Sequence, residues 1–110
     1  MLEKYEMTMS KYANFLAFDL GAESARGIVG TLDNKKLKLK EIYRFETKGT
    51  LFGGHIHWDI LGFLRHVIKA MGLYKTRYDD PISIGVNTWG VDFGLLDKRR
   101  LCYIFCKIVL

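Results

Sequence analysis

The chain has 110 residues, of which 49% are hydrophobic and 14% aromatic. It is therefore long and apolar enough for one domain with a buried core, and disorder is excluded for most of it. The formal charge is +5, but residues 98–110 hold four basic side chains and no acidic one, so residues 1–97 carry only +1. Because this larger part has no basic stripe with interleaved aromatic residues, we expect no nucleic-acid partner.

Residues 1–13 are polar and mixed in charge, so we expect a leader or loose extension without a secretory signal. Both cysteines, Cys102 and Cys106, lie in residues 98–110. The lack of cysteine before them fits a reducing, cytoplasmic compartment. The apolar run 101–110 is shorter than the roughly 20 residues that a membrane span needs, so we expect no membrane partner.

Hydrophobic periodicity predicts three consecutive strands at residues 14–20, 27–32 and 36–45. The third strand begins with alternating lysine and leucine, which is typical of a strand with one solvated face. Short connections, including a turn at Asp33–Asn34, favour an antiparallel meander. Residues 49–57 contain three glycines and are expected to form a loop.

Asp59 stands where the N-cap of a helix should be, and apolar residues then recur at helical spacing up to about residue 71. We expect this stripe in the core, unless truncation leaves it uncovered, and His66 on the solvated side. The stripe consists of Ile60, Leu64, Val67, Ile68 and Met71.

After Asp79-Asp80-Pro81, residues 82–86 are apolar enough for a short buried strand, and a turn at 87–90 leads to a further strand at 91–97. The order β-β-β-α-β predicts an α/β fold with a mixed sheet. Neither a G-x-G-x-x-G nor a Walker A pattern occurs, so neither a Rossmann nor a P-loop site is supported.

Residues 18–27 join a strand that ends in Asp19 to a glycine turn, a hydroxyl and Arg26. Such a turn can bring N–H groups against a phosphate, while the acid holds hydrated Mg²⁺ and the arginine neutralises oxygens. The alternatives remain open: Asp19 could be a turn residue without a ligand, Arg26 could pair simply with Asp19 or Glu23, and Ser24 could bond to its own turn.

Four segments in this order, residues 19–26, 41–45, 57–59 and 84–93, resemble the N-terminal part of the FGGY carbohydrate kinases. Within that family they are most similar to the branch that phosphorylates L-rhamnulose, and the resemblance covers about residues 15–97. It implies a partial actin-like ATPase (ribonuclease H-like) N-terminal domain. It also implies that ATP and Mg²⁺ serve to phosphorylate the 1-hydroxyl of a ketose such as L-rhamnulose.

The resemblance implies that Asp19 approaches the Mg²⁺·ATP phosphates, through water, and that Gly90 contacts the sugar with Trp89 and Asp92 nearby. Trp89 could instead be a core or cleft-wall residue, Asp92 a satisfied polar group, and the pair His55 and His57 a loop feature rather than a metal site. The implied phosphate-binding residues are Gly21, Ala22, Glu23, Ser24, Ala25 and Arg26.

Two residues depart from the family pattern. Ala25 stands where the family usually has glycine, which could crowd a backbone that needs a positive φ. Asn87 stands where the family usually has aspartate, which removes a charge near the sugar pocket.

A larger departure follows residue 97, where the family continues through a glycine turn to a Tyr-Arg-Asp segment. We expect residues 98–110 to be an aberrant tail from a frameshift or premature stop, after a leader (1–13) and a partial kinase domain (14–97). A genuine tail, docking on membranes or acidic partners, is the alternative. On the first interpretation the general-base aspartate and the adenine pocket are missing, and the chain is inactive alone. It could then persist as a non-catalytic nucleotide- or sugar-binding, self-associating remnant.

Overall fold

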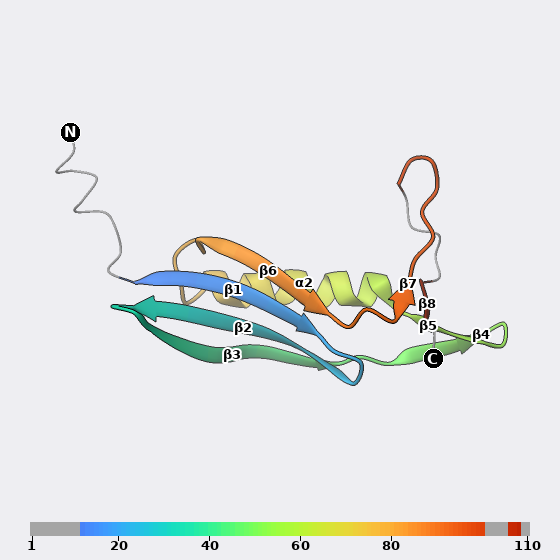
Figure 1. Cartoon of the computed structure of the whole chain (residues 1–110), viewed down its shortest axis with the longest axis horizontal. Coiled ribbons are helices and arrows are strands. Elements are labelled where there is room, and N and C mark those ends of the chain that lie inside the picture. The colour runs from blue at the N-terminus through green and yellow to red at the C-terminus, as the bar shows by residue number, and fades with distance from the viewer. Residues whose placement is uncertain (1–11, 101–105, 109–110) are drawn as a thin grey trace.

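The computed structural model describes residues 12–100 and the backbone of residues 106–108. Its main sheet has four strands in the order β3-β2-β1-β6, and helix α2 (Ile60–Lys75) lies against one face of it (Figure 1). β1 pairs antiparallel with β2 and parallel with β6, and β2 pairs antiparallel with β3, so the predicted α/β fold with a mixed sheet is confirmed. The strands are β1 (Ala13–Leu20), β2 (Ser24–Asp33), β3 (Lys36–Glu46) and β6 (Ser83–Thr88).

The first three strands form the predicted meander. Asn34 and Lys35 make the turn between β2 and β3, and both have positive φ (43° and 71°). This is the backbone that two-residue hairpin turns prefer, because its twist matches that of the strands. β2 begins at Ser24, three residues earlier than predicted, and its pairing with β3 shifts register between Gly27 and Ile28.

The loop expected at residues 49–57 is instead a β-hairpin. Strand β4 (Gly49–Phe52) pairs antiparallel with β5 (His55–Trp58). Gly53 and Gly54 connect them with φ of 57° and 78°, which glycine adopts without a steric penalty. The prediction was wrong because the two glycines form the turn itself, while the residues on either side pair.

A second sheet has the order β4-β5-β8-β7. β7 (Asp92–Phe93) is all that forms of the strand expected at residues 91–97, so that prediction was too long. β8 (Cys106–Ile108) is also short and pairs antiparallel with both β5 and β7. Part of the expected tail 98–110 therefore takes part in a sheet. Cys102 lies outside the described residues, as does most of the expected leader, although β1 already begins at Ala13.

Asp59 caps α2 as predicted, since its side chain accepts a hydrogen bond from the Gly62 N–H at 2.8 Å. The carboxylate lies so close to the Gly62 Cα that a β-carbon there would collide with its Oδ2. Gly62 is therefore required by the cap, although glycine is a poor helix former. The helix continues to Lys75, four residues beyond the predicted end.

The face of α2 that is buried is not the predicted one. Gly62, Ala70 and Tyr74 are buried, whereas four of the five residues of the expected core stripe are exposed. The small side chains let the helix approach the sheet closely: a β-carbon on Gly27 would lie 3.4 Å from the Ala70 Cβ. Because α2 is apolar on both sides, periodicity alone did not identify the packed face. The core consists of Leu16, Phe18, Val29, Ala70 and Tyr74.

His66 is also not solvated as expected. It is half-buried, its Nδ1 lies 2.8 Å from the Tyr43 hydroxyl, and its ring stacks on Phe45 with centroids 4.1 Å apart. His66 was expected to be solvated because it lies opposite the stripe that was expected to be buried. The wrong choice of buried face on α2 therefore explains both incorrect predictions.

Strand β6 was expected to be buried, yet all six of its residues are exposed. It lies at an edge of the main sheet, and among the described residues only β1 pairs with it. Helix α2 packs chiefly on β2 and β3, so Ile84 and Val86 remain 47% and 64% exposed.

Candidate functional site

The predicted site lies where β1 and β6 end. Because these strands are parallel, their carboxyl ends meet at the same edge of the sheet. Asp19 of β1 stands opposite Asn87 of β6 on one side and opposite Arg26 of β2 on the other. The sheet register therefore brings together three residues that are far apart in the sequence.

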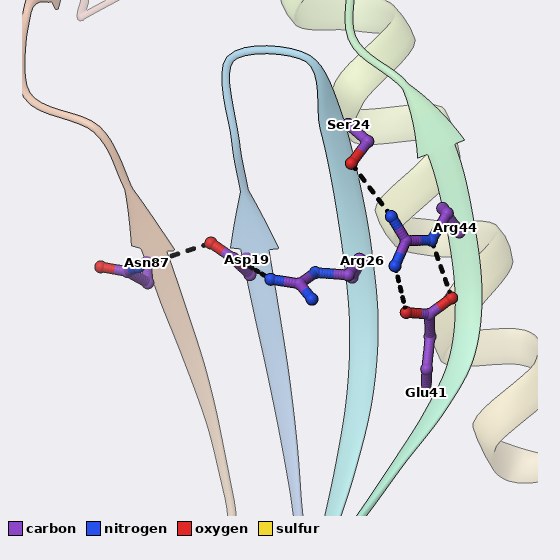
Figure 2. Close-up of polar contacts among 6 residues, drawn as sticks. All are labelled: Asp19, Ser24, Arg26, Glu41, Arg44 and Asn87. Carbon is purple, nitrogen blue, oxygen red and sulfur yellow. Dashed lines mark hydrogen bonds and ion pairs between the residues drawn. The ribbon is translucent and has the colours of Figure 1, made fainter.

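Asp19 and Arg26 point toward each other (Figure 2). The Arg26 Nη2 donates to the Asp19 Oδ2 at 2.5 Å, and the Asn87 Nδ2 donates to the Oδ1 at 3.4 Å. The hydrogen bond from Arg26 lowers the pKa of the Asp19 carboxyl, more than partial burial raises it. Asp19 is thus held as a carboxylate, with its side chain 32% exposed and that of Arg26 40% exposed.

Residues 21–23 form the turn between β1 and β2. The Gly21 N–H donates to the Ser24 carbonyl at 3.1 Å, and a β-carbon on Gly21 would lie only 2.6 Å from that oxygen. Glycine is therefore needed here because of a close backbone approach. In the described part of the chain, the N–H groups of Ala22 and Glu23 make no hydrogen bond, which leaves two donors at the turn.

Thr47 braces this turn, and no sequence motif indicated this role. Its N–H donates to the Glu23 carbonyl at 3.1 Å and its hydroxyl donates to the Gly21 carbonyl at 2.8 Å. Thr47 is only 4% exposed, so both bonds are shielded from water. A threonine two residues after the alternating strand has no motif of its own, and only the fold places it under the turn.

The other predicted phosphate-turn residues, Ser24, Ala25 and Arg26, lie in β2 rather than in the turn. Ala25 is fully buried in extended backbone, opposite Leu20 and Phe45. The expectation that its β-carbon would crowd a backbone with positive φ was wrong, because this position is part of a regular ladder.

A second arginine lies beside this group. Arg44 of β3 stands directly opposite Arg26, and Figure 2 shows its guanidinium between Ser24 and Glu41. It donates to both carboxylate oxygens of Glu41, at 2.9 and 2.7 Å, and to the Ser24 Oγ at 3.2 Å. Residues 41–45 belong to the segments that carry the family resemblance, but the sequence indicated no role at the site for Arg44 or Glu41.

The predicted sugar-contact residues follow β6 directly. Trp89 is half-buried, Gly90 is exposed with open space around it, and Asp92 is half-buried at the start of β7. These three residues therefore leave the sheet near the carboxyl ends of β1 and β6, where Asp19 also lies. The hydrogen bonds of Asp19 go to Arg26 and Asn87 and not to these three residues.

No group of three or more His, Cys, Asp or Glu side chains within the described ranges could hold a metal ion. Asp19 is a partly exposed carboxylate, and Mg²⁺ is commonly bound through one or two carboxylates together with the phosphates of its nucleotide. His55 and His57 lie in β5, with ring centroids 6.4 Å apart. Among the described residues, no helix is long and apolar enough to cross a membrane.

Sequence comparison confirms the resemblance to carbohydrate kinases. A rhamnulokinase of Bacteroides thetaiotaomicron is 47% identical over 85 residues, and one of Bacillus subtilis is 36% identical over 85 residues. In each case the match covers 77% of this chain but only 18% of the relative, so the chain spans about a fifth of its curated relatives. No family model matches the sequence.

Structure comparison confirms the fold. A crystal structure of gluconate kinase from Lactobacillus acidophilus superposes with a TM-score of 0.69 over 88% of this chain and 19% of that one. The identity is 12%, so this likeness bears on the fold alone. It agrees with the expected part of an actin-like ATPase domain.

Proposed function

Because the chain resembles the FGGY carbohydrate kinases in sequence and in fold, we propose that it carries the phosphate-binding edge of a kinase that phosphorylates a ketose with ATP. L-rhamnulose, converted to L-rhamnulose 1-phosphate, is the proposed substrate, since the sequence relatives are rhamnulokinases. The observation that carries the proposal is the Asp19–Arg26 contact beside the braced turn, at the edge where Trp89 and Gly90 leave β6.

Phosphoryl transfer asks a protein mainly for positioning and for neutralisation of charge. In this proposal the N–H groups of Ala22 and Glu23 donate to phosphate oxygens, and Arg26 neutralises their charge. Asp19 holds a hydrated Mg²⁺, which would screen the negative charge of the triphosphate when bound. The braces from Thr47 support the proposal, because a turn fixed before binding loses less entropy when the nucleotide arrives.

On the sugar side, we assign Gly90 a backbone contact and place Trp89 and Asp92 near the ketose. Open space around the Gly90 Cα fits a close approach of substrate to the backbone. The general base is assigned to the part of the relatives that this chain does not match. Since residues 1–97 contain no cysteine, we further propose the cytoplasm as the compartment.

The isolated chain is expected to bind Mg²⁺·ATP weakly and to show no turnover, because a kinase site between two lobes cannot close around one partial lobe. Titration calorimetry with Mg²⁺·ATP tests the binding, and a coupled assay with L-rhamnulose tests the turnover. Saturable binding that is lost in Arg26→Ala supports the proposal. Absence of binding by the unmodified chain contradicts it, and turnover contradicts the expected inactivity.

A second candidate function is that of a non-catalytic, self-associating remnant. Exposed apolar side chains favour it: Leu61, Ile82 and Val86 are 71%, 69% and 64% exposed. Exposed apolar side chains that gather into a patch usually mark an interaction site or an aggregation hazard. Sedimentation of the purified chain tests this second candidate function. A chain that stays monomeric at micromolar concentration would contradict self-association.

A further inference from the structure

Arg44 is held from two sides by side chains of different elements. Two of its nitrogens donate to the two oxygens of Glu41 on the same strand, and its Nη1 donates to the Ser24 Oγ on the neighbouring strand (Figure 2). Glu41 raises the pKa of the Arg44 guanidinium and Arg44 lowers that of the Glu41 carboxyl, so both groups stay charged. A two-point contact of this kind fixes the plane of the guanidinium.

This ion pair is a poor candidate for a purely stabilising role. The side chains of Arg44 and Glu41 are 51% and 40% exposed, and exposed pairs add little to stability. Arg44 also stands directly opposite Arg26, and like charges in opposed positions repel. Each arginine is balanced by its own carboxylate, Asp19 for Arg26 and Glu41 for Arg44.

The consequence falls on Ser24. A hydroxyl has one proton to donate and two lone pairs that accept. Since Arg44 carries only donors, the bond between them uses a lone pair of the Ser24 oxygen and turns its proton away from Arg44. The hydroxyl proton is then available to another acceptor.

We infer that Arg44, fixed by Glu41, is a positioning residue of the phosphate site, which orients the Ser24 hydroxyl to donate to a phosphate oxygen. The inference rests on the proposed function, in which the turn 21–23 and Arg26 face the phosphates of ATP. Arg44 acts through Ser24 in this account and does not itself bind the nucleotide.

The decisive experiment is a double-mutant cycle, read by calorimetry with Mg²⁺·ATP on the full 110-residue chain. Loss of one hydrogen bond predicts about fivefold weaker binding for Ser24→Ala and for Arg44→Ala. If Arg44 acts through Ser24, the double variant binds no more weakly than Ser24→Ala. If the two losses multiply instead, Arg44 contacts the nucleotide independently and the inference is overturned.

A conservative replacement separates geometry from charge. In Arg44→Lys the positive charge remains, but one ammonium cannot reproduce the planar contact with Glu41 together with the bond to Ser24. We therefore expect it to bind Mg²⁺·ATP as weakly as Arg44→Ala, and full affinity would overturn the inference. Lys38→Ala is the matched control, because it removes one exposed positive charge from β3 and is expected to bind normally.

A second measurement needs no nucleotide. The side-chain N–H signals of Arg44 in NMR spectra are expected to show slow rotation of the guanidinium, which is lost in Glu41→Gln. Freely rotating signals in the unmodified chain would overturn the inference, whatever the affinity for ATP. If the slow rotation is observed but the unmodified chain binds no Mg²⁺·ATP, the proposed function is contradicted. The role of Arg44 at a phosphate site is then contradicted as well, although its contact with Glu41 is confirmed.

Discussion

At the scale of single residues, the account depends on the contact between Asp19 and Arg26. A pairing of Arg26 with Asp19 or Glu23 was one of the alternatives that the sequence left open. The antiparallel register of β1 and β2 places Arg26 opposite Asp19, with which it pairs. The sequence could not indicate that Arg44, which pairs with Glu41, also donates to Ser24, because Ser24 is 20 residues away and the register is a property of the sheet.

The Asp19 carboxyl provides a prediction about acid stability. Its pKa is lower in the folded chain than the usual value near 3.9, so the unfolded chain binds more protons there and stability falls as the pH drops through the folded pKa. Asp19→Asn should lose less stability between about pH 5 and pH 3 than the unmodified chain, as measured by urea unfolding. At pH 7 it should cost less than about 1 kcal/mol, since the pair is partly exposed. An unchanged acid slope would contradict the assignment.

Asn87 provides a second prediction at this scale. An aspartate there, as the family usually has, would replace a donor to Asp19 by a second carboxylate in the neighbouring strand. Asn87→Asp should therefore raise the pKa of Asp19, as followed by ¹³C NMR titration of the carboxyl. Asn14→Asp, at the opposite end of β1, is the control and should leave it unchanged. A pKa of Asp19 that does not rise in Asn87→Asp would show that the two side chains are not neighbours.

At the scale of elements, sequence reasoning found three strands, the helix and its cap, because turn residues and the Asp59 signal are local. It missed the β4–β5 hairpin, because Gly53–Gly54 can be read either as a loop or as a turn. It also misplaced the buried face of α2 and the burial of β6. Both depend on which surfaces pack together in the folded chain. The apolar pattern of a single helix or strand does not show which of its faces another element covers.

The cap of α2 gives a prediction for this scale. Asp59→Ala should lower the free energy of unfolding by about 1 kcal/mol, through loss of the bond to the Gly62 N–H. Gly62→Ala should destabilise the chain because its new β-carbon meets the Asp59 carboxylate, and it should cost less in the Asp59→Ala background. Gly72→Ala, with open space around it, is the control and should stabilise the helix by up to about 1 kcal/mol. Thermal unfolding followed by circular dichroism measures all four variants, and equal costs of Gly62→Ala in both backgrounds would refute the steric explanation.

At the scale of the whole molecule, the two edges of the main sheet differ. β3 carries three lysines, Lys36, Lys38 and Lys40, whereas β6 carries no charge and is exposed along its length. Charged side chains protect an edge strand against pairing with another chain, so β6 is the edge open to association.

Val86→Lys should therefore shift the purified chain toward monomer, because it adds a charge to β6. Leu39→Lys on β3 is the matched control and should leave the distribution of species unchanged. Sedimentation velocity at several concentrations provides the measurement. Equal association of Val86→Lys and the unmodified chain would exclude β6 as the contact.

The central claim is that the turn between β1 and β2 contacts the phosphates of ATP, and backbone amide NMR tests it most directly. On addition of Mg²⁺·ATP, we expect the largest shift changes at the amides of Ala22, Glu23 and Ser24, and their loss in Arg26→Ala. If the chemical shifts of these three amides do not change, whether or not other signals shift, the phosphate site is not at this turn. That result would contradict the kinase proposal.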